Sequence, residues 1–176
     1  MSEKQSRGYR DEINRWRSER DRFFSEHYAS PLGDEAMASF EGLEYFEIDE
    51  SLVFSAVVRP RTAPTVGIDS STGFSSDYPV AGVIDVPFPE GNISLLALQG
   101  EEEEAFIPFR DGTCGGDSYG AGRYVPIKIE SDGSCVVDFN RAINPLCAYD
   151  PEFSCPLPPQ ENWLERSIAA GEKDFR

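Results

Sequence analysis

Short apolar runs bounded by turn-forming residues dominate the sequence from Leu43 onward. Clusters of proline, glycine, serine and aspartate separate these runs at regular intervals. Alternation of apolar and polar residues puts every second side chain on one face of a strand, as in a sheet with one buried face. The predicted strands are Glu44–Ile48, Leu52–Val58, Thr65–Asp69, Val80–Val86, Ile93–Gln99, Ala105–Phe109, Arg123–Ile129 and Cys135–Phe139.

A helical pattern precedes the strands, over residues 7–28. Opposite charges stand four residues apart along it, as in Asp11 with Arg15, which supports a helix. Pro31 and Gly33 mark its end. The apolar side chains recur at spacings of three, four and seven, so one face of the helix is predicted to be apolar: Tyr9, Ile13, Trp16, Phe23, Phe24 and His27.

Prolines crowd the region 145–159, which excludes a regular helix or a central strand there. A short C-terminal helix is predicted from Trp163 to Ala170, with Asn162 as its cap and Gly171 as its end. The length fits one domain. We therefore expect a mainly β fold of the α+β class, an antiparallel β-barrel or sandwich, in a single domain 1–176: an amphipathic N-terminal helix (1–30), a β-rich body (43–140), and the proline-rich segment with the short helix (141–176).

Acidic residues outnumber basic ones 32 to 16, giving a net charge of −16. This charge repels phosphate backbones and anionic lipid, so neither nucleic acid nor a membrane is expected as a partner. Only three of the basic residues are lysines, and such scarcity beside an acid excess is typical of halophilic proteins; an ordinary acidic protein is the alternative. The glutamates 101–104 follow Gly100 between two strands, where a solvated turn is expected in preference to a cation site.

The chain opens without a signal-peptide pattern and contains no long apolar run of membrane-spanning length, so a cytoplasmic location is expected. In that compartment Cys114, Cys135, Cys147 and Cys155 are expected to be free, buried thiols. A disulfide between Cys147 and Cys155 and a bound metal are the alternatives. The spacing C-x20-C-x11-C-x7-C has no close zinc knuckle, so we predict no metal site and no cofactor.

Familiar catalytic signatures are missing from the sequence: there is no G-x-S-x-G elbow, phosphate loop, H-E-x-x-H or dinucleotide fingerprint. The single histidine, His27, lies on the apolar stripe of the first helix, more than eighty positions before the richest motifs. A packed or hydrogen-bonded role at the edge of the core is therefore favoured for His27 over that of a catalytic base.

The most unusual text is Asp111-Gly-Thr-Cys-Gly-Gly-Asp-Ser-Tyr-Gly-Ala-Gly-Arg-Tyr, followed by Asp138-Phe-Asn-Arg-Ala-Ile-Asn-Pro-Leu-Cys-Ala-Tyr. With Cys155-Pro-Leu-Pro-Pro-Gln-Glu-Asn162 and Ala170-Gly-Glu-Lys173, these blocks resemble an uncharacterised prokaryotic family designated a domain of unknown function, DUF1684, of which this would be an archaeal, halophile-like member. Roughly the C-terminal half carries the resemblance, which implies no particular reaction. Ile143, Trp163 and Glu165 depart from the family pattern.

Glycines in the first block allow tight turns and expose backbone amides that bind anions. Arg123 and Arg141 stand out in so acidic a protein, because guanidinium suits bidentate capture of a carboxylate or phosphate. The leading hypothesis is a module that binds a small molecule or anionic ligand in a pocket within the region 111–162. Its predicted lining residues are Tyr119, Arg123, Asp138, Asn140, Arg141 and Asn144.

Three other roles are open. The same residues are suited to fastening an irregular proline-rich chain through buried hydrogen bonds. A hydrolase or isomerase would use Asp138 or Asp111 as the base and an arginine to stabilise developing negative charge. A non-enzymatic interaction protein, such as a homodimer, would place the Trp16 and Phe23 face of the first helix on a second subunit.

Overall fold

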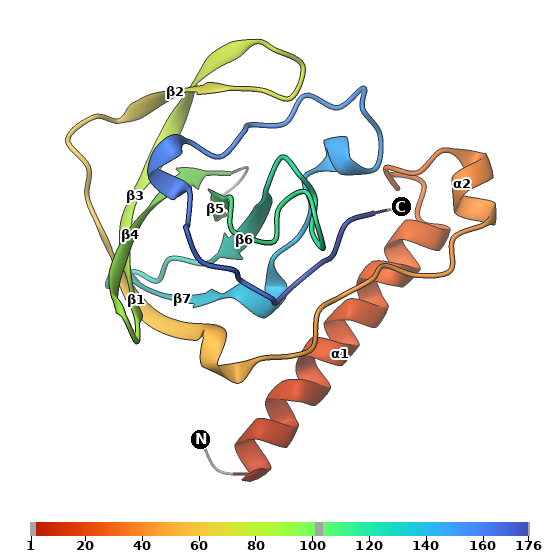
Figure 1. Ribbon diagram of the computed structural model, residues 1–176, viewed down its shortest axis with the longest axis horizontal. Helices are drawn as coiled ribbons and strands as arrows, with labels where there is room; N and C mark the ends of the chain where they lie inside the picture. Colours follow the sequence, from red (N-terminus) through yellow and green to blue (C-terminus); the bar gives the residue numbers. More distant parts are fainter. Residues whose placement is uncertain (1–2, 101–103, 176) are drawn as a thin grey trace.

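The computed structural model describes residues 3–100 and 104–175, and its centre is an antiparallel sheet that curls into a nearly closed barrel (Figure 1). The strands lie in the order β6-β5-β4-β3-β1-β7, and β2 pairs with β3 beside this path. The mainly β fold predicted from the sequence is confirmed. The strands are β1 (Val53–Arg59), β2 (Thr65–Asp69), β3 (Ser75–Phe88), β4 (Gly91–Gln99), β5 (Ala105–Phe109), β6 (Arg123–Ile127) and β7 (Ser134–Asp138).

Closure of the barrel comes from the chain that follows β7. Tyr124 of β6 and Ile143 form an antiparallel bridge, with the Tyr124 N–H donating to the Ile143 carbonyl at 2.8 Å and the reverse bond at 2.9 Å. A 3-10 turn, η2 (Phe139–Arg141), separates this bridge from β7. The residues around Asn140 therefore join the two ends of the sheet.

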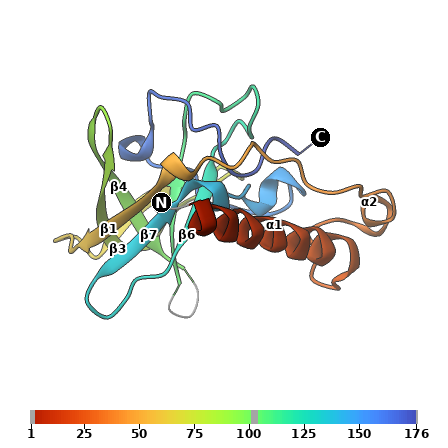
Figure 2. The same ribbon diagram turned by 90° about the horizontal axis from the view of Figure 1, so that it is seen from below.

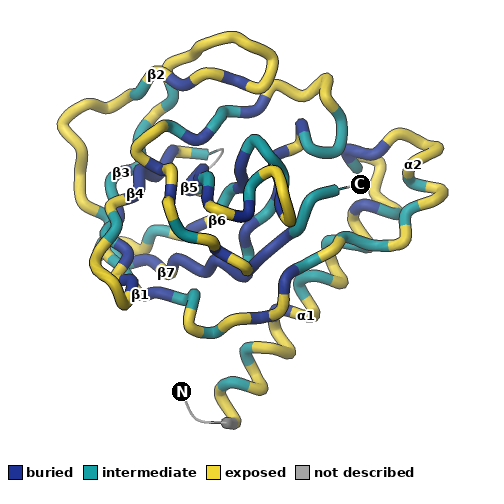
Figure 3. The backbone as a smooth tube through the Cα atoms, in the orientation of Figure 1, coloured by how far each residue is buried: buried dark blue, intermediate teal, exposed yellow. Residues whose placement is uncertain are grey.

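Burial alternates along β6 and the second half of β3, whereas β4 and β5 are buried over runs of four and three residues. β4, β5 and β6 carry most of the buried side chains, whereas β2 is mostly exposed (Figure 3). Phe109 and Phe139 meet edge to face at 5.3 Å in the centre, and both are fully buried. Apolar burial of this kind is the main favourable contribution to folding.

The N-terminal helix α1 (Glu3–Glu26) lies along the outside of the barrel (Figure 2). Ile13 and Phe24 of the predicted apolar stripe are buried against the body of the same chain, whereas Phe23 and His27 of that stripe are exposed. Arg10 and Arg17 donate to the backbone carbonyls of Ile48 and Phe46 and fasten the helix laterally. The helix prediction is thus confirmed, and a short helix α2 (Asp34–Ala38) that was not predicted follows it.

The predicted strand Glu44–Ile48 is wrong. This segment makes a single bridge, from Tyr45 to Glu172, and lies alongside the C-terminal chain through bonds from Phe46 N–H to Gly171 O and from Lys173 N–H to Glu44 O, each 2.9 Å long. Its partner is itself irregular, so no ladder extends beyond the bridge. The predicted turn at residues 101–103 lies outside the described residues.

The predicted C-terminal helix Trp163–Ala170 is also wrong, because residues 163–175 run as extended, irregular chain after a 3-10 turn, η4 (Gln160–Asn162). Most of their backbone hydrogen bonds go to other parts of the chain, and Ala170 N–H to Ile168 O at 2.9 Å is a bond within the segment. Leu164 N–H donates to Arg110 O and Gly112 N–H to Arg166 O, each at 2.8 Å. Tertiary hydrogen bonds have replaced helical ones.

Asn162, expected to cap that helix, is fully buried instead. Its amide accepts from Leu96 N–H at 2.7 Å and donates to the Leu96 and Pro108 carbonyls at 2.8 and 2.6 Å. Asn162 therefore bonds the C-terminal segment to β4 and β5. Its side chain is the hydrogen-bond partner of backbone groups of Leu96 and Pro108.

We predict that Asn162→Ala lowers the free energy of unfolding by about 2 to 3 kcal/mol, because it leaves buried backbone groups without hydrogen-bond partners. Urea denaturation measures the change. The matched control is Gln160→Ala in the same turn, whose side chain is exposed and whose replacement should leave stability nearly unchanged. Equal effects of the two substitutions would contradict the assignment.

Candidate functional site

Arg123, at the start of β6, is fully buried and binds the C-terminal segment of its own chain. Its guanidinium donates to the carbonyl oxygens of Ile168 at 2.8 Å, Glu172 at 3.0 Å and Ala170. Asp111 supplies the compensating negative charge at 3.3 Å. Burial lowers the pKa of Arg123, and this carboxylate opposes the effect.

Asp111 is equally enclosed, with no exposed side-chain surface. It accepts hydrogen bonds from the Ile168 N–H at 2.6 Å and from the Thr113 hydroxyl at 3.0 Å, in addition to Arg123. A general base needs an open face toward its substrate. The geometry of Asp111 is that of a fastening group.

A second network holds the predicted residues Asp138 and Asn140 around Tyr9 of α1. The Tyr9 hydroxyl donates to Asp138 at 2.9 Å, and Asn140 donates to Tyr9 at 3.0 Å and to the Asp49 carbonyl at 2.8 Å. Burial, followed by the charge of Asp138, raises the pKa of Tyr9 above its ordinary range. This network ties the start of α1 to the closing turn of the barrel.

Arg141 completes the second network from a partly exposed position. It pairs with Asp138 at 3.5 Å and with Glu12 of α1, and its guanidinium lies 5.4 Å from the Trp16 ring. A shallow cavity of about 570 Å³ borders Tyr9, Asp138 and Arg141. Among the described residues, Arg123 and Arg141 share no hydrogen-bond partner, so the two arginines belong to separate networks. Their role in ligand binding stays a prediction.

Asn144 lies at a third place, beside the buried carboxylate of Glu172. Its backbone N–H donates to Glu172 Oε2 at 2.8 Å, and its side-chain nitrogen donates to the Lys173 carbonyl at 2.7 Å. Its side-chain oxygen Oδ1 is buried and has no hydrogen-bond partner within residues 3–100 and 104–175. We call this atom the open acceptor.

Glu172 itself anchors three separate segments. It pairs with Arg20 of α1 at 2.6 Å, and it accepts from Tyr149 as well as from Asn144. Burial, followed by the charge of Glu172, raises the pKa of Tyr149 well above its ordinary value. Gly171 precedes it with φ +76, and an added Cβ would lie 2.6 Å from Ala142 O, so only glycine fits this bend.

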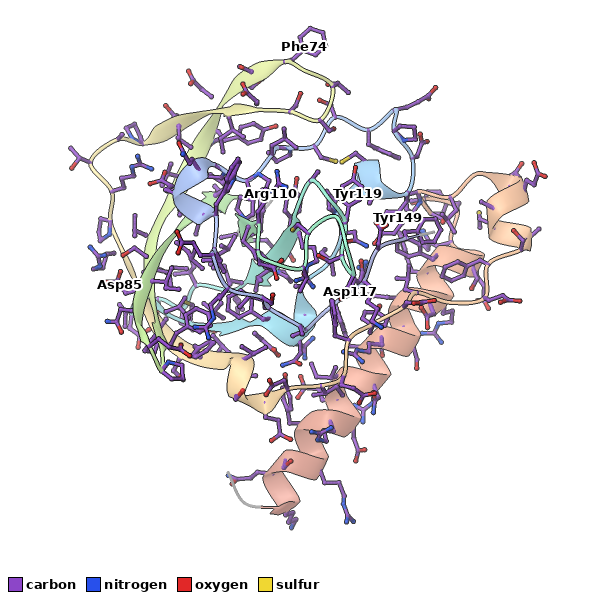
Figure 4. All side chains as sticks on the ribbon, in the orientation of Figure 1. Phe74, Asp85, Arg110, Asp117, Tyr119 and Tyr149 are labelled. Carbon is purple, nitrogen blue, oxygen red and sulfur yellow. The ribbon has the colours of Figure 1, made fainter. Side chains whose placement is uncertain are left out.

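A groove of about 780 Å³ opens beside Asn144, between the C-terminal end of α1, strands β3 to β6 and the proline-rich segment. Figure 4 shows Tyr149 near the end of α1, on the side of the barrel that also carries Tyr119. The Tyr119 hydroxyl lies 3.4 Å from the carbonyl oxygen of Cys147, and the preceding residue, Leu146, borders the groove. Aromatic rings from distant segments line the groove: Phe23, Phe24, Tyr78, Phe106, Tyr124 and Tyr149.

Most of the residues that line this groove were not predicted from the sequence. Its rings come from segments far apart in the chain, and each ring alone is indistinguishable from an ordinary core residue. The one usable signal was Asn144, which was predicted to bind ligand and does line the groove. His27 lies elsewhere, exposed and stacked on Phe23 at 4.6 Å, where it accepts from the Ala29 N–H.

Two further properties of the described residues concern the binding of a metal ion and the crossing of a membrane. They include no group of three or more histidine, cysteine, aspartate or glutamate side chains placed to hold a metal ion. They also include no helix that is long and apolar enough to cross a membrane.

Comparisons with known proteins give a family and a fold, without an activity. Residues 38–173 match the family described as protein of unknown function (DUF1684). The solution NMR structure of an uncharacterized protein from Haloarcula marismortui is similar over 98% of this chain and 97% of that one, with 36% sequence identity and a TM-score of 0.73. No curated protein matches the chain significantly.

We predict that Arg123→Ala destabilises the protein by about 3 to 5 kcal/mol, because it leaves Asp111 charged and buried. Thermal and urea unfolding measure the loss. Arg59→Ala is the control, since Arg59 forms an exposed pair with Asp85 at 2.8 Å and its loss should matter little. An Arg123→Ala protein as stable as the control would refute the fastening role.

Proposed function

The chain belongs to the DUF1684 family of proteins of unknown function, and for it we propose that the groove beside Asn144 binds a small, neutral, mostly apolar molecule that carries one hydrogen-bond donor. The observation that carries the proposal is the open acceptor, the buried Asn144 Oδ1 that lacks a partner in the described chain. A groove of about 780 Å³ is within the usual size range of small-molecule sites.

The walls of the groove support an apolar, partly aromatic ligand. Phe106 and Tyr124 lie 4.9 Å apart on neighbouring strands, and Phe24 and Tyr149 meet edge to face at 4.7 Å across the end of α1. Such rings offer flat surfaces on which another ring packs favourably. Prolines 79, 126, 145 and 156 add rigid apolar surface that needs little ordering when a ligand binds.

Polar groups around the groove support one hydrogen bond from the ligand. The Tyr124 hydroxyl already donates to the Pro156 carbonyl at 2.6 Å, and the Asn144 amide nitrogen already donates to Lys173. The open acceptor therefore stands apart as a buried oxygen without a donor. A buried, unsatisfied polar atom costs free energy that a ligand N–H or O–H would recover.

Charges at the groove support a neutral ligand over the anionic one expected from the sequence. Arg20 borders the groove, but its charge is compensated by Glu172 at 2.6 Å. Glu104 adds a negative charge at the rim. An anion would compete with Glu172 for Arg20 and would be repelled by Glu104.

The alternatives from the sequence have weaker support. Asp111 is enclosed by donors, and Asp138 is held by Tyr9 and Arg141, so neither presents an open carboxylate as a base. The first helix buries Ile13 and Phe24 against its own barrel, which leaves the homodimer a prediction. The cytoplasmic location likewise stays a prediction.

N-phenyl-1-naphthylamine is a suitable probe, because it is neutral and aromatic and has one N–H donor. We expect a saturable rise in its fluorescence with the wild-type protein. Leu146→Glu places a charge on the groove wall and should weaken binding about tenfold, or about 1.4 kcal/mol. Val57→Glu is the matched control, since Val57 is an exposed aliphatic residue on β1 and does not border the groove.

The same titration with the N-methylated probe isolates the hydrogen bond. Loss of one donor should weaken binding about fivefold, corresponding to about 1 kcal/mol. Equal affinity for the two probes would show that the open acceptor does not bind the N–H of the probe. Equal affinity of the Leu146→Glu and Val57→Glu proteins would remove the groove as the binding site.

A further inference from the structure

Two cysteines meet at the wall of the groove, on either end of the loop 147–155. The Cys147 N–H donates to the Cys155 sulfur at 3.3 Å, and both residues are almost fully buried, with 7% and 6% of their surfaces exposed. Cys155 borders the groove directly. All four cysteines of the chain are free thiols in the structure.

The loop around this pair is held from two sides. On one side, Ser71 in the turn after β2 accepts from the Cys155 N–H at 3.0 Å, and its own N–H donates to the Cys155 carbonyl at 2.9 Å. On the other side, Cys147 lies in a 3-10 turn, η3 (Leu146–Ala148). The Tyr119 hydroxyl is within hydrogen-bond distance of both the carbonyl oxygen and the sulfur of Cys147. The two sulfurs are thus positioned by contacts from separate parts of the barrel.

The surroundings of the two sulfurs differ. Hydrogen bonds from Cys155, Ser71 and Tyr119 lower the pKa of Cys147 below that of an ordinary thiol, against the opposing effect of burial. The pKa of Cys155 is raised, chiefly because its proton is shared with Cys147 and then because it is buried. The lower pKa makes the Cys147 sulfur the better nucleophile of the two.

We propose that Cys147 and Cys155 are a redox-active thiol pair that exchanges with small-molecule disulfides. The Cys147 thiolate attacks one sulfur of the disulfide, so a mixed disulfide forms and one thiolate leaves. Cys155 then gives its proton to the released thiolate and attacks the Cys147 sulfur, which closes the bond between Cys147 and Cys155 and expels a second thiolate that takes a proton from water. In total the protein pair is oxidised by two electrons and one small disulfide is reduced to two thiols.

This proposal is independent of ligand binding in the groove. The pair uses its own contacts with Ser71 and Tyr119, and neither sulfur bonds to Asn144 in the described chain. Probe binding is measured with a reductant present and thiol exchange without the probe. Failure of either experiment therefore leaves the other standing.

The test treats the folded, reduced full chain with bis(2-hydroxyethyl) disulfide and follows each cysteine by intact mass and peptide mapping. Wild-type protein should form a disulfide between Cys147 and Cys155. Cys155→Ser should stop at a mixed disulfide on Cys147, and Cys147→Ser should leave Cys155 unmodified over the same time. Cys135 is the matched internal control, since it is 5% exposed and burial raises its pKa.

Cys147 should react on the order of tenfold faster than Cys135, because its larger thiolate fraction outweighs the lower reactivity of a weaker base. Equal rates at the two sites, an adduct that forms first on Cys155, or a wild-type pair that stays reduced while Cys114 is modified would each overturn the proposal. Near-ultraviolet circular dichroism checks the fold of the variants. If Cys147→Ser does not fold, the order of modification in the wild-type protein decides.

Discussion

Arg123 carries a positive charge into the interior of an acidic protein, where water cannot stabilise it. The charge is tolerated because Asp111 lies 3.3 Å away and because the carbonyls of Ile168, Ala170 and Glu172 converge on the guanidinium. Because the guanidinium needs these partners, Arg123 holds the C-terminal chain against the start of β6. An extended tail without regular structure is thereby bonded to the barrel.

The groove depends on that tail. Once Arg123 holds the backbone of Glu172, the Glu172 carboxylate reaches Arg20 of α1 and the backbone of Asn144. The helix end, the tail and the proline-rich segment then share one buried anchor. Aromatic side chains of the helix end and of the proline-rich segment line the groove together with rings from the strands, and Asn144 borders it.

Alternation of apolar and polar residues predicted seven of the eight expected strands, which are present as β1 to β7, although β3 begins at Ser75, before the predicted Val80. Prediction from the sequence failed for the tail, where Asn162 looked like a helix cap but instead bonds to β4 and β5. Local patterns do not report such tertiary bonds. For the same reason the protein partners of Arg123 and Arg141, Glu172 and Glu12 among them, were not foreseen from the sequence.

The most direct test of the account is a nuclear magnetic resonance titration of side-chain amides with N-phenyl-1-naphthylamine. The account predicts saturable shifts of the Asn144 amide, whose oxygen would accept the probe N–H, while the buried amides of Asn140 and Asn162 stay in place. Shifts of Asn140 with Asn144 unchanged would instead assign binding to the cavity beside Tyr9 and Asp138 and contradict the account.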